Sequence, residues 1–418
     1  MSNKAKSNET IEYTRSAVKM SQKTSLNSSK NAYFGILLLG IVSLMGDVVY
    51  EGSRGIVPSY LEFLGATALI VGLVGGLGDF LGYAVRLVSG FLADTTRAYW
   101  LFIFLGYGLI VSIPFLGLPL GLEIAVILVL LERFGKAFRS PSRDTVLSII
   151  SKDVGAGKAF GIHELLDQIG GILGPLIVAF LMLSVNNYNF TFSFLFLPFL
   201  VLLVVLVYTY KRIRSKTIII EPRRIEGKRE KLARPFYIYT FAVLLNTVGL
   251  IPYTLILYKA SEILQPIGQQ WIVPLIYLLI QGVDAPVALI AGYAYDRFGI
   301  GILVMPFLLS LFPSLLTMVG AELSTLMAAA IVFGLVLGMQ ESVYRAAVSE
   351  LTPISSRGTA YGIFNTAYGV GFLISGAVYG LLMELKPPFI AVMFYVFMMQ
   401  ITATVSLLSI RLELEKHK

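Results

Sequence analysis

The stretch Gly90-Phe-Leu-Ala-Asp94 recurs in the second half of the chain as Gly292-Tyr-Ala-Tyr-Asp296. At almost the same offset, Ala159-Phe-Gly-Ile-His163 recurs as Ala360-Tyr-Gly-Ile-Phe364. Two independent matches at nearly one spacing indicate an internal repeat. We therefore expect two similar halves that run in the same direction through the fold.

The composition indicates that both halves lie in a lipid bilayer. Of the 418 residues, 56% are hydrophobic and only 14% are charged, whereas a soluble domain carries about 25% charged residues. A bilayer core about 30 Å thick requires roughly 20 apolar residues per helix. We expect an all-α membrane protein with two parallel six-helix bundles and twelve transmembrane helices, at about 33–60, 66–93, 99–118, 122–150, 158–184, 190–211, 236–258, 271–295, 300–320, 324–350, 358–383 and 388–410.

The basic residues set the expected orientation in the membrane. They concentrate between Lys211 and Pro235 and in alternate short connections that contain Arg97, Lys152 and Arg297. Because cytoplasmic loops carry an excess of Lys and Arg, both termini should be cytoplasmic in the cell membrane. The expected divisions are a disordered cytoplasmic tail (1–32), an N-terminal bundle (33–211), a basic cytoplasmic linker (212–235), a C-terminal bundle (236–411) and a second cytoplasmic tail (412–418).

The repeated stretch resembles the loop motif of the major facilitator superfamily of transporters, which combines Gly, Asp and basic residues. The resemblance covers about residues 33 to 410 and implies a substrate site near the membrane midplane, between the two halves. Glycine allows helices to approach closely, and aspartate caps a helix or pairs with arginine. The gating residues that the resemblance implies in these loops are Gly90, Asp94, Arg97, Gly292, Asp296 and Arg297.

The fifth apolar run carries a second motif. Gly161, Gly170, Gly174 and Pro175 have the spacing that is typical of the superfamily's antiporters. Small residues permit tight helix packing, and proline removes one backbone hydrogen bond and bends a helix. The resemblance associates this shape with export.

Ionisable residues within the apolar runs are the main functional signal. The chain resembles prokaryotic permeases that have an acidic helix 1 (here Asp47 to Glu51), a basic helix 4 (Glu132 to Asp144) and a Gly-x-His-x-x-x-Asp helix 5 (Gly161 to Asp167). A charge at the bilayer centre costs roughly 2.5–3.5 kcal/mol on insertion scales, so each requires a partner or a function.

Two carboxyl groups at mid-membrane depth suggest proton coupling. Asp47 and Glu51 are four residues apart, so they share one helical face. A carboxyl group whose surroundings change between two states loads a proton on one side and releases it on the other. His163 and Asp167, one turn apart in the fifth apolar run, could join this relay. The hypothesis assigns proton coupling to Asp47, Glu51, His163 and Asp167.

The remaining polar residues of the runs are candidates for substrate binding. A basic stripe that includes Lys136 and Arg139 favours an anionic or carboxylated substrate. Structural alternatives are intrahelical ion pairs, as in Glu132–Lys136 and Glu341–Arg345, and side chains that extend to the interface, as for Arg139. The full substrate-binding set is Arg54, Asp79, Glu132, Arg133, Lys136, Arg139, Asn246, Gln281, Asp284, Glu341, Arg345 and Asn365.

Several other functions are disfavoured. The sequence has no cysteine and two histidines, which argues against a tight zinc site, and it lacks a phosphate-binding loop of the Walker type. We expect no enzyme activity, cofactor or nucleic-acid partner, and a monomer that contacts a small solute, protons and lipid. The leading function is proton-coupled export of a small solute or drug. The alternatives are a proton-coupled importer, a divalent-metal exporter and a membrane sensor that transports nothing.

Overall fold

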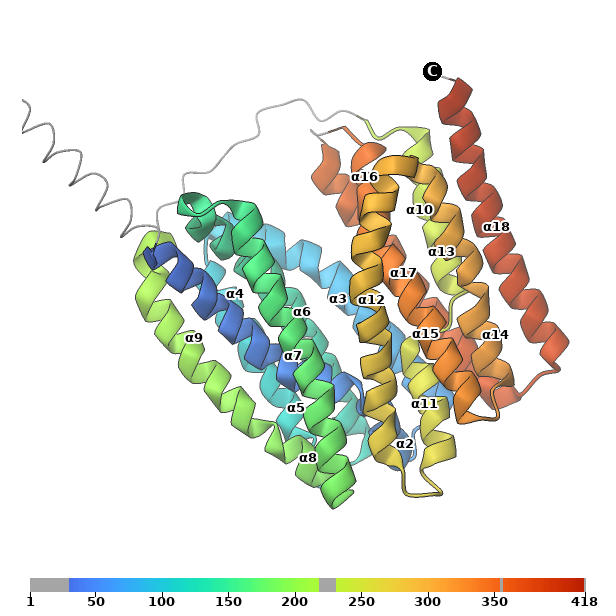
Figure 1. Ribbon diagram of the computed structural model, residues 1–418, viewed down its shortest axis with the longest axis horizontal. Helices are drawn as coiled ribbons and strands as arrows, with labels where there is room; N and C mark the ends of the chain where they lie inside the picture. Colours follow the sequence, from blue (N-terminus) through green and yellow to red (C-terminus); the bar gives the residue numbers. More distant parts are fainter. Residues whose placement is uncertain (1–29, 218–230, 354–355, 417–418) are drawn as a thin grey trace, which may run out of the picture.

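The computed structural model describes residues 30–217, 231–353 and 356–416, and all regular elements within them are helical (Figure 1). The expected all-α fold is therefore confirmed for this part of the chain. Most of the predicted N-terminal tail, the central part of the basic linker and the last two residues lie outside the described residues. The helices run beyond two predicted boundaries, to Thr217 and to Lys416.

The first half begins with a helix from Lys30 to Arg54. A short break at Gly55 and Ile56 separates this helix from α2 (Val57–Phe63), which has seven residues. The further helices of this half are α3 (Ala68–Thr96), α4 (Tyr99–Gly108), α5 (Ser112–Phe115), α6 (Leu122–Ile150), α7 (Ala156–Val185), α8 (Tyr188–Phe194) and α9 (Phe196–Thr217).

The second half repeats this pattern, with more breaks within its helices. Its first helical segment is interrupted between Val248 and Tyr253, and its fourth contains a π-helical turn at Gln340–Tyr344. The helices are α10 (Arg234–Val248), α11 (Tyr253–Leu264), α12 (Val273–Phe298), α13 (Val304–Leu309), α14 (Leu311–Val319), α15 (Leu323–Met339), α16 (Arg345–Glu350), α17 (Arg357–Leu385) and α18 (Phe389–Lys416).

Each predicted apolar run coincides with a helical segment. Within the described residues, nine helical stretches are long and apolar enough to cross a membrane, and Tyr99–Phe115 forms a shorter apolar helix. Helix α6 is as long as α3 but is rich in charged residues, among them Glu132, Arg133, Lys136 and Arg139. The chain is thus a multi-pass membrane protein, and the number of crossings stays a prediction.

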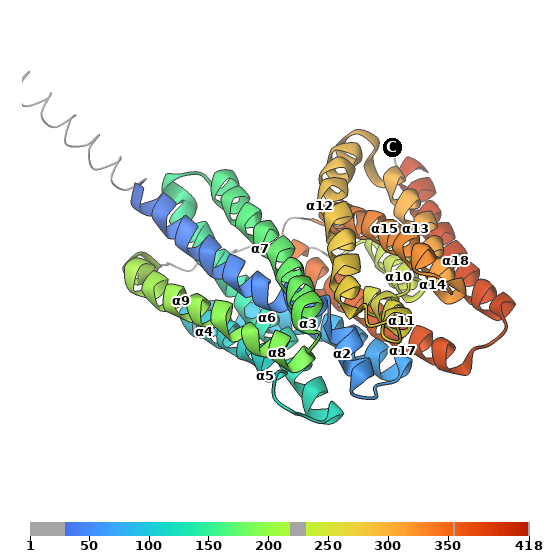
Figure 2. The ribbon, with the colours of Figure 1, turned by 60° about the horizontal axis from the view of Figure 1, so that its bottom comes forward.

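The two halves lie side by side and diverge toward one end (Figures 1 and 2). We call the end that carries the C-terminus and the α6–α7 connection the upper end, as drawn in Figure 1, and the opposite end the lower end. Helix α3 packs along α17, and α7 packs along α12, so each half contributes two helices to the contact.

Glycines bring α3 and α17 together at the lower end. A Cβ atom added at Gly72 would lie 2.2 Å from the backbone oxygen of Gly376, and one at Gly76 would lie 2.5 Å from that of Phe372. Such distances are far below van der Waals contact, so only glycine allows the backbones to meet here. Leu69 N also donates to Glu384 Oε1 at 3.1 Å.

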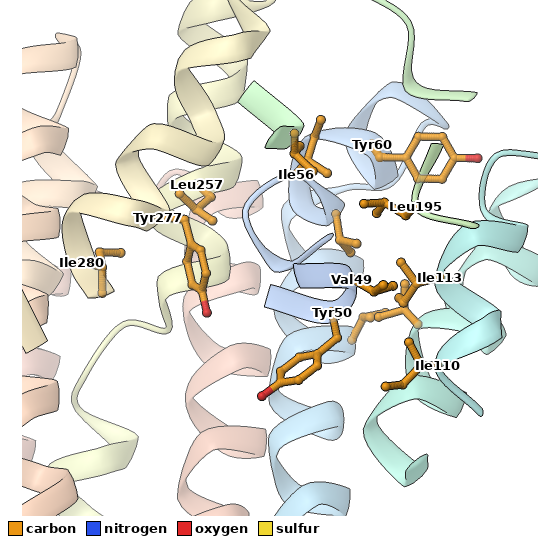
Figure 3. Packing of buried hydrophobic residues seen from close by; sticks show 14 of the residues in the cluster. Val49, Tyr50, Ile56, Tyr60, Ile110, Ile113, Leu195, Leu257, Tyr277 and Ile280 are labelled. Atoms are coloured by element: carbon orange, nitrogen blue, oxygen red, sulfur yellow. The ribbon is translucent and has the colours of Figure 1, made fainter. Parts of the chain in front are cut away.

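Apolar packing fixes the direction of the first helix. Val49 packs with Ile110 and Ile113 in the core of the first half, whereas Tyr50 extends from the opposite side of the helix, toward the half that carries Tyr277 (Figure 3). Because successive residues of a helix are about 100° apart, this packing turns one face of the helix toward the second half. That face carries Asp47, Glu51 and Arg54.

Candidate functional site: a charged cavity between the halves

A cavity of about 640 Å³ lies between the two halves. Its lining reaches the upper ends of α6 and α7, where Asp144 and Phe160 are exposed. The structure brings most of the predicted polar residues to this one space. The predicted residues that line it are Asp47, Glu51, Arg54, Asp79, Arg133, Lys136, Arg139, Gly161, His163, Asp167, Gln281, Asp284, Glu341 and Arg345.

Three residues of the expected substrate-binding set lie elsewhere. Glu132 is 2% exposed and faces a small pocket below the cavity, where it contacts Arg133 and Arg139. Asn246 is fully buried in a hydrogen-bond network with Gln340, Tyr344 and Gln400. Asn365 is half-buried on α17 outside the cavity lining. Helical spacing alone does not distinguish a side chain that faces a cavity from one that faces a neighbouring helix.

Glu51 is the most highly connected carboxylate of the cavity. Arg54 Nη1 donates to Glu51 Oε1 at 2.9 Å, and Lys136 Nζ lies 3.6 Å from the same oxygen. The Tyr277 hydroxyl of α12 donates to Glu51 Oε2. Two cations and one hydroxyl therefore stabilise this buried charge, and the hydroxyl comes from the other half.

Asp47 lies one turn away on the same helix face in a different environment. Its side chain is 7% exposed, and among the described residues it forms no hydrogen bond or ion pair. The helix of α7 approaches it closely, because a Cβ atom at Gly170 would lie 2.8 Å from Asp47 Cβ. A buried carboxyl group without a partner is costly in its charged form.

The basic residues Lys136 and Arg139 of α6 make different contacts. Lys136 pairs with Glu51 and lies over the Tyr50 ring at 4.5 Å. The alternative of an intrahelical Glu132–Lys136 pair is thus replaced, in the described residues, by an interhelical pair. Arg139 is 2% exposed, and its guanidinium lies 3.8 Å from Glu132 and over the Tyr50 and Tyr107 rings. Arg139 is thus buried in the protein and does not extend to the membrane interface.

Arg133 reaches the cavity because α3 leaves room for it. A Cβ atom at Gly78 would lie 3.0 Å from Arg133 Cγ, so a larger residue there would push the arginine aside. The guanidinium lies 3.7 Å from Asp79 Oδ1 and donates to the Tyr253 hydroxyl at 3.0 Å. Tyr253 belongs to the second half, so this contact also joins the halves.

His163 and Asp167 form a cluster with Arg143 near the upper end of the cavity. His163 Nδ1 lies 3.4 Å from Asp167 Oδ2, and Arg143 Nη1 lies 3.5 Å from the same oxygen. Arg143 also donates to Ser43 at 2.8 Å and pairs with Asp144. His163 Nε2 and Asp167 Oδ1 are buried and have no hydrogen-bond partner among residues 30–217, 231–353 and 356–416.

The two copies of the gating motif stand at the ends of α3 and α12 and make different contacts. Asp94 accepts a hydrogen bond from the Tyr99 hydroxyl at 3.0 Å, and Arg97 ends α3 in a left-handed conformation. Among the described residues, neither Asp94 nor Asp296 forms an ion pair with an arginine. The latch that such pairs would form is absent at the upper end, where the halves diverge. Arg297 lies over the Phe298 ring, and a Cβ at Gly292 or Gly161 would meet no atom within 4 Å.

The glycines of the α7 motif pack against the first helix. A Cβ atom at Gly174 would lie 2.7 Å from Val48 O, and one at Gly170 would lie 2.5 Å from Leu44 O. Pro175 lies inside α7 next to this contact. The motif therefore controls how closely α7 approaches the helix that carries Asp47 and Glu51.

The floor of the cavity depends on two tyrosines that sequence analysis did not identify. Tyr277 and Tyr253 join the second half to Glu51 and Arg133. The chain contains 22 tyrosines, and no spacing distinguishes these two. Below them, α2 packs on α11, and a Cβ atom at Gly55 would lie 3.0 Å from Pro274. The lower end of the cavity is closed by contacts between the halves.

Replacing Tyr277 by phenylalanine should favour a form that is open at the lower end. A hydrogen bond to a charged group contributes about 1.5–3 kcal/mol, so its loss should shift the equilibrium at least about tenfold. The chain has no cysteine, and Val57 is buried at the start of α2, at the closed lower end. A single Val57→Cys substitution can therefore report whether reagents in the solvent reach this end. We expect faster labelling by an impermeant thiol reagent in the Tyr277→Phe background.

A matched control for this prediction is Tyr379→Phe. The Tyr379 hydroxyl donates to Gly249 O at 2.6 Å and is fully buried, but both residues belong to the second half. This variant should lose thermal stability without a change in Val57→Cys labelling. Equal labelling rates in the two variants would show that the Tyr277 contact does not hold the lower end closed.

Comparison with known proteins reveals similarity over most of the chain. The sequence model of the Major Facilitator Superfamily matches residues 36–376 and 266–416. An uncharacterized protein of Mycobacterium tuberculosis is 32% identical over 395 residues, which cover 91% of this chain and 94% of the relative. An uncharacterized MFS-type transporter of Methanocaldococcus jannaschii is 27% identical and covers 86% of this chain and 90% of its own length.

Solved structures extend the comparison to the fold. A mutant form of the nucleoside transporter NupG superposes with a TM-score of 0.70, over 90% of this chain and 99% of that one, at 13% sequence identity. At this level of identity the likeness shows the fold alone. The expected family resemblance is therefore supported by both sequence and structure.

Proposed function

The chain belongs to the Major Facilitator Superfamily and is therefore a membrane transporter and not an enzyme, and we propose that it exports a small solute in exchange for protons. In this proposal the chain has twelve transmembrane helices and both termini lie in the cytoplasm. It works as a monomer that alternates between two states. The basic connections near the upper end favour a cytoplasmic location for that end. The described state would then be open to the cytoplasm and closed to the outside.

The observation that carries the proposal is the position of the cavity. It lies between the halves, is lined by both, and is closed at one end by contacts between them. A transporter that works by alternating access requires a site of this kind, reached from one side at a time. Separation of α3 from α17 at Gly72 and Gly376, with loss of the Tyr253 and Tyr277 contacts, would open the other side.

Proton coupling is proposed to centre on Asp47. Its carboxyl group is buried beside the cavity without a partner, so binding a proton removes an unfavourable charge. Glu51, in contrast, is held by Arg54, Lys136 and Tyr277, and its donors change when the halves separate. The His163–Asp167–Arg143 cluster lies along the route to the upper end and would relay protons there.

Export is favoured over import by the packing of α7. Gly170 places α7 directly against Asp47, so the proton site and the antiporter-like motif form one contact. Motion of α7 would then change the surroundings of Asp47. A divalent-metal exporter is disfavoured, because the described residues contain no group of three or more His, Asp or Glu side chains arranged to hold a metal ion.

Inverted membrane vesicles with an acidic lumen test this function. Addition of a transported solute outside an antiporter should discharge the luminal acidity, as reported by a pH-sensitive dye. A symporter would acidify the lumen further under the same conditions. A panel of metabolites and drugs that moves into the lumen without any change in luminal pH would refute proton coupling, and vesicles without the protein supply the baseline.

A further inference from the structure

The carboxyl group of Asp284 on α12 is buried in the cavity wall, with no hydrogen-bond or ion-pair partner in the part of the chain that the structure describes. The residue is 7% exposed, and Oδ1 has no hydrogen-bond donor. It lines the central cavity from the second half of the chain. An unpaired carboxylate at this depth is costly, which indicates that a positively charged or donor group occupies the cavity beside it during the transport cycle.

Glu341 supplies a second carboxyl group to the same wall. It lies in the π-helical turn that packs on α12, and a Cβ atom at the nearby Gly338 would lie 2.5 Å from Asp284 O. Glu341 is exposed to the cavity. The expected pair with Arg345 does not form, because no Arg345 nitrogen lies within 4.0 Å of Glu341 among the contacts of the described residues.

The carboxyl groups of the cavity differ in how their charges are balanced. In the first half, Glu51, Asp79 and Asp167 each have an arginine or lysine within 4.0 Å, whereas Asp47 has none among the described residues. The charged groups that interact electrostatically with Asp284 are Glu341 of the second half and Glu51 and Glu164 of the first, all of them acidic. Glu341 itself also interacts with the cations Arg345 and Lys136. The immediate surroundings of Asp284 are therefore acidic, which favours a cation beside it.

Aromatic side chains flank this acidic wall. Tyr277 lies two turns before Asp284 on α12, and Phe333 lies on α15, which packs against α12. Aromatic rings attract organic cations through the negative charge of their faces. Carboxylates with adjacent rings suit a protonated amine better than a bare metal ion, which prefers several oxygen ligands.

We propose that Asp284 and Glu341 bind a protonated amine of the transported solute. This inference rests on the proposed function, since it names the solute class for the same cavity. Asp284 contributes the buried carboxylate, which contacts the ammonium group directly, and Glu341 adds charge at the side that faces the cavity opening. The solute is thus an amine-bearing small molecule whose uncharged analogue binds weakly.

Thermal-shift and calorimetric titrations of the purified full chain test this inference. The probes are a panel of primary and secondary amines, each paired with its isosteric alcohol, beginning with benzylamine and benzyl alcohol. At least one amine should bind more tightly than its alcohol. Asp284→Asn should weaken that amine at least about 30-fold, since loss of one partner of a buried charge pair removes most of the interaction.

Glu322→Gln is the control, because Glu322 is an exposed acid of the second half that lies outside the cavity lining. It should bind the amine within about threefold of the wild type, since exposed charges contribute little. If no amine exceeds its alcohol, or if Asp284→Asn binds the amine like the wild type, the inference is wrong. A proton-coupling role for Asp284 would give this second result together with altered proton movement.

The binding assay separates this inference from the proposed function. Amine binding that depends on Asp284, in a protein that moves no solute in vesicles, would support the site and refute transport. Solute-driven proton movement that persists in Asp284→Asn with unchanged solute affinity would support transport and refute the amine site.

Discussion

Asp47→Asn should abolish solute-driven proton movement, to the level of vesicles that lack the protein. An amide has nearly the shape of the carboxyl group but cannot bind and release a proton in the relevant range. Asp47 forms no hydrogen bond or ion pair with the described residues, so the substitution removes no native polar contact and keeps the packing against α7. The variant should therefore fold normally and still bind solute. The dye assay in inverted vesicles gives the proton signal, and calorimetry gives the binding.

The control for Asp47→Asn is Glu164→Gln, which also removes one cavity carboxylate. Glu164 accepts only an intrahelical hydrogen bond from Gln168 at 3.2 Å and is exposed. Proton movement should persist in this control. A full proton signal in Asp47→Asn would assign coupling to another group, with the Asp167 cluster as the next candidate.

The second large effect is expected at the contact between α3 and α17. In Gly376→Ala, the new Cβ atom would lie 2.1 Å from Gly72 O, which forces the two backbones apart. Because protein interiors are close-packed, this contact cannot absorb a methyl group without a shift of the helices. We expect loss of transport and rapid labelling of Val57→Cys, because the lower end no longer closes.

Gly108→Ala provides the control for this substitution. Gly108, the last residue of α4, is also a helical glycine within an apolar segment, but a Cβ atom there would meet no atom within 4 Å. Alanine at such a site should raise stability slightly, by roughly 0.5–1 kcal/mol, because it stiffens the helix. Normal transport with a protected Val57→Cys in Gly376→Ala would show that the α3–α17 contact is not required for closure.

Hydropathy and helical periodicity predicted the elements and one wall of the cavity. Long apolar runs can satisfy their backbone groups in lipid only as helices, so each run became a helical segment. The face shared by Asp47, Glu51 and Arg54 follows directly from the period of the α-helix, and all three line the cavity.

Contacts between elements distant in sequence could not be predicted in the same way. The reach of Arg133 depends on a glycine of α3, and the closure of the lower end depends on Tyr253 and Tyr277 of the other half. Neither leaves a local pattern in the sequence. The Glu341–Arg345 spacing predicts an ion pair in a regular α-helix, but the π-helical turn breaks that regularity.

The π-helical turn also sets the rotation of everything that follows it. One extra residue per turn offsets the subsequent side chains by roughly 100° about the helix axis. The side chain of Gln340, within this turn, donates to Asn246 Oδ1 at 3.2 Å and accepts a hydrogen bond from the Tyr368 hydroxyl at 2.7 Å. The rotation of α16 about its axis thus depends on the number of residues in the π-helical turn as well as on their identity. Deletion of one residue from this turn would point Arg345 in another direction, even with every other side chain unchanged.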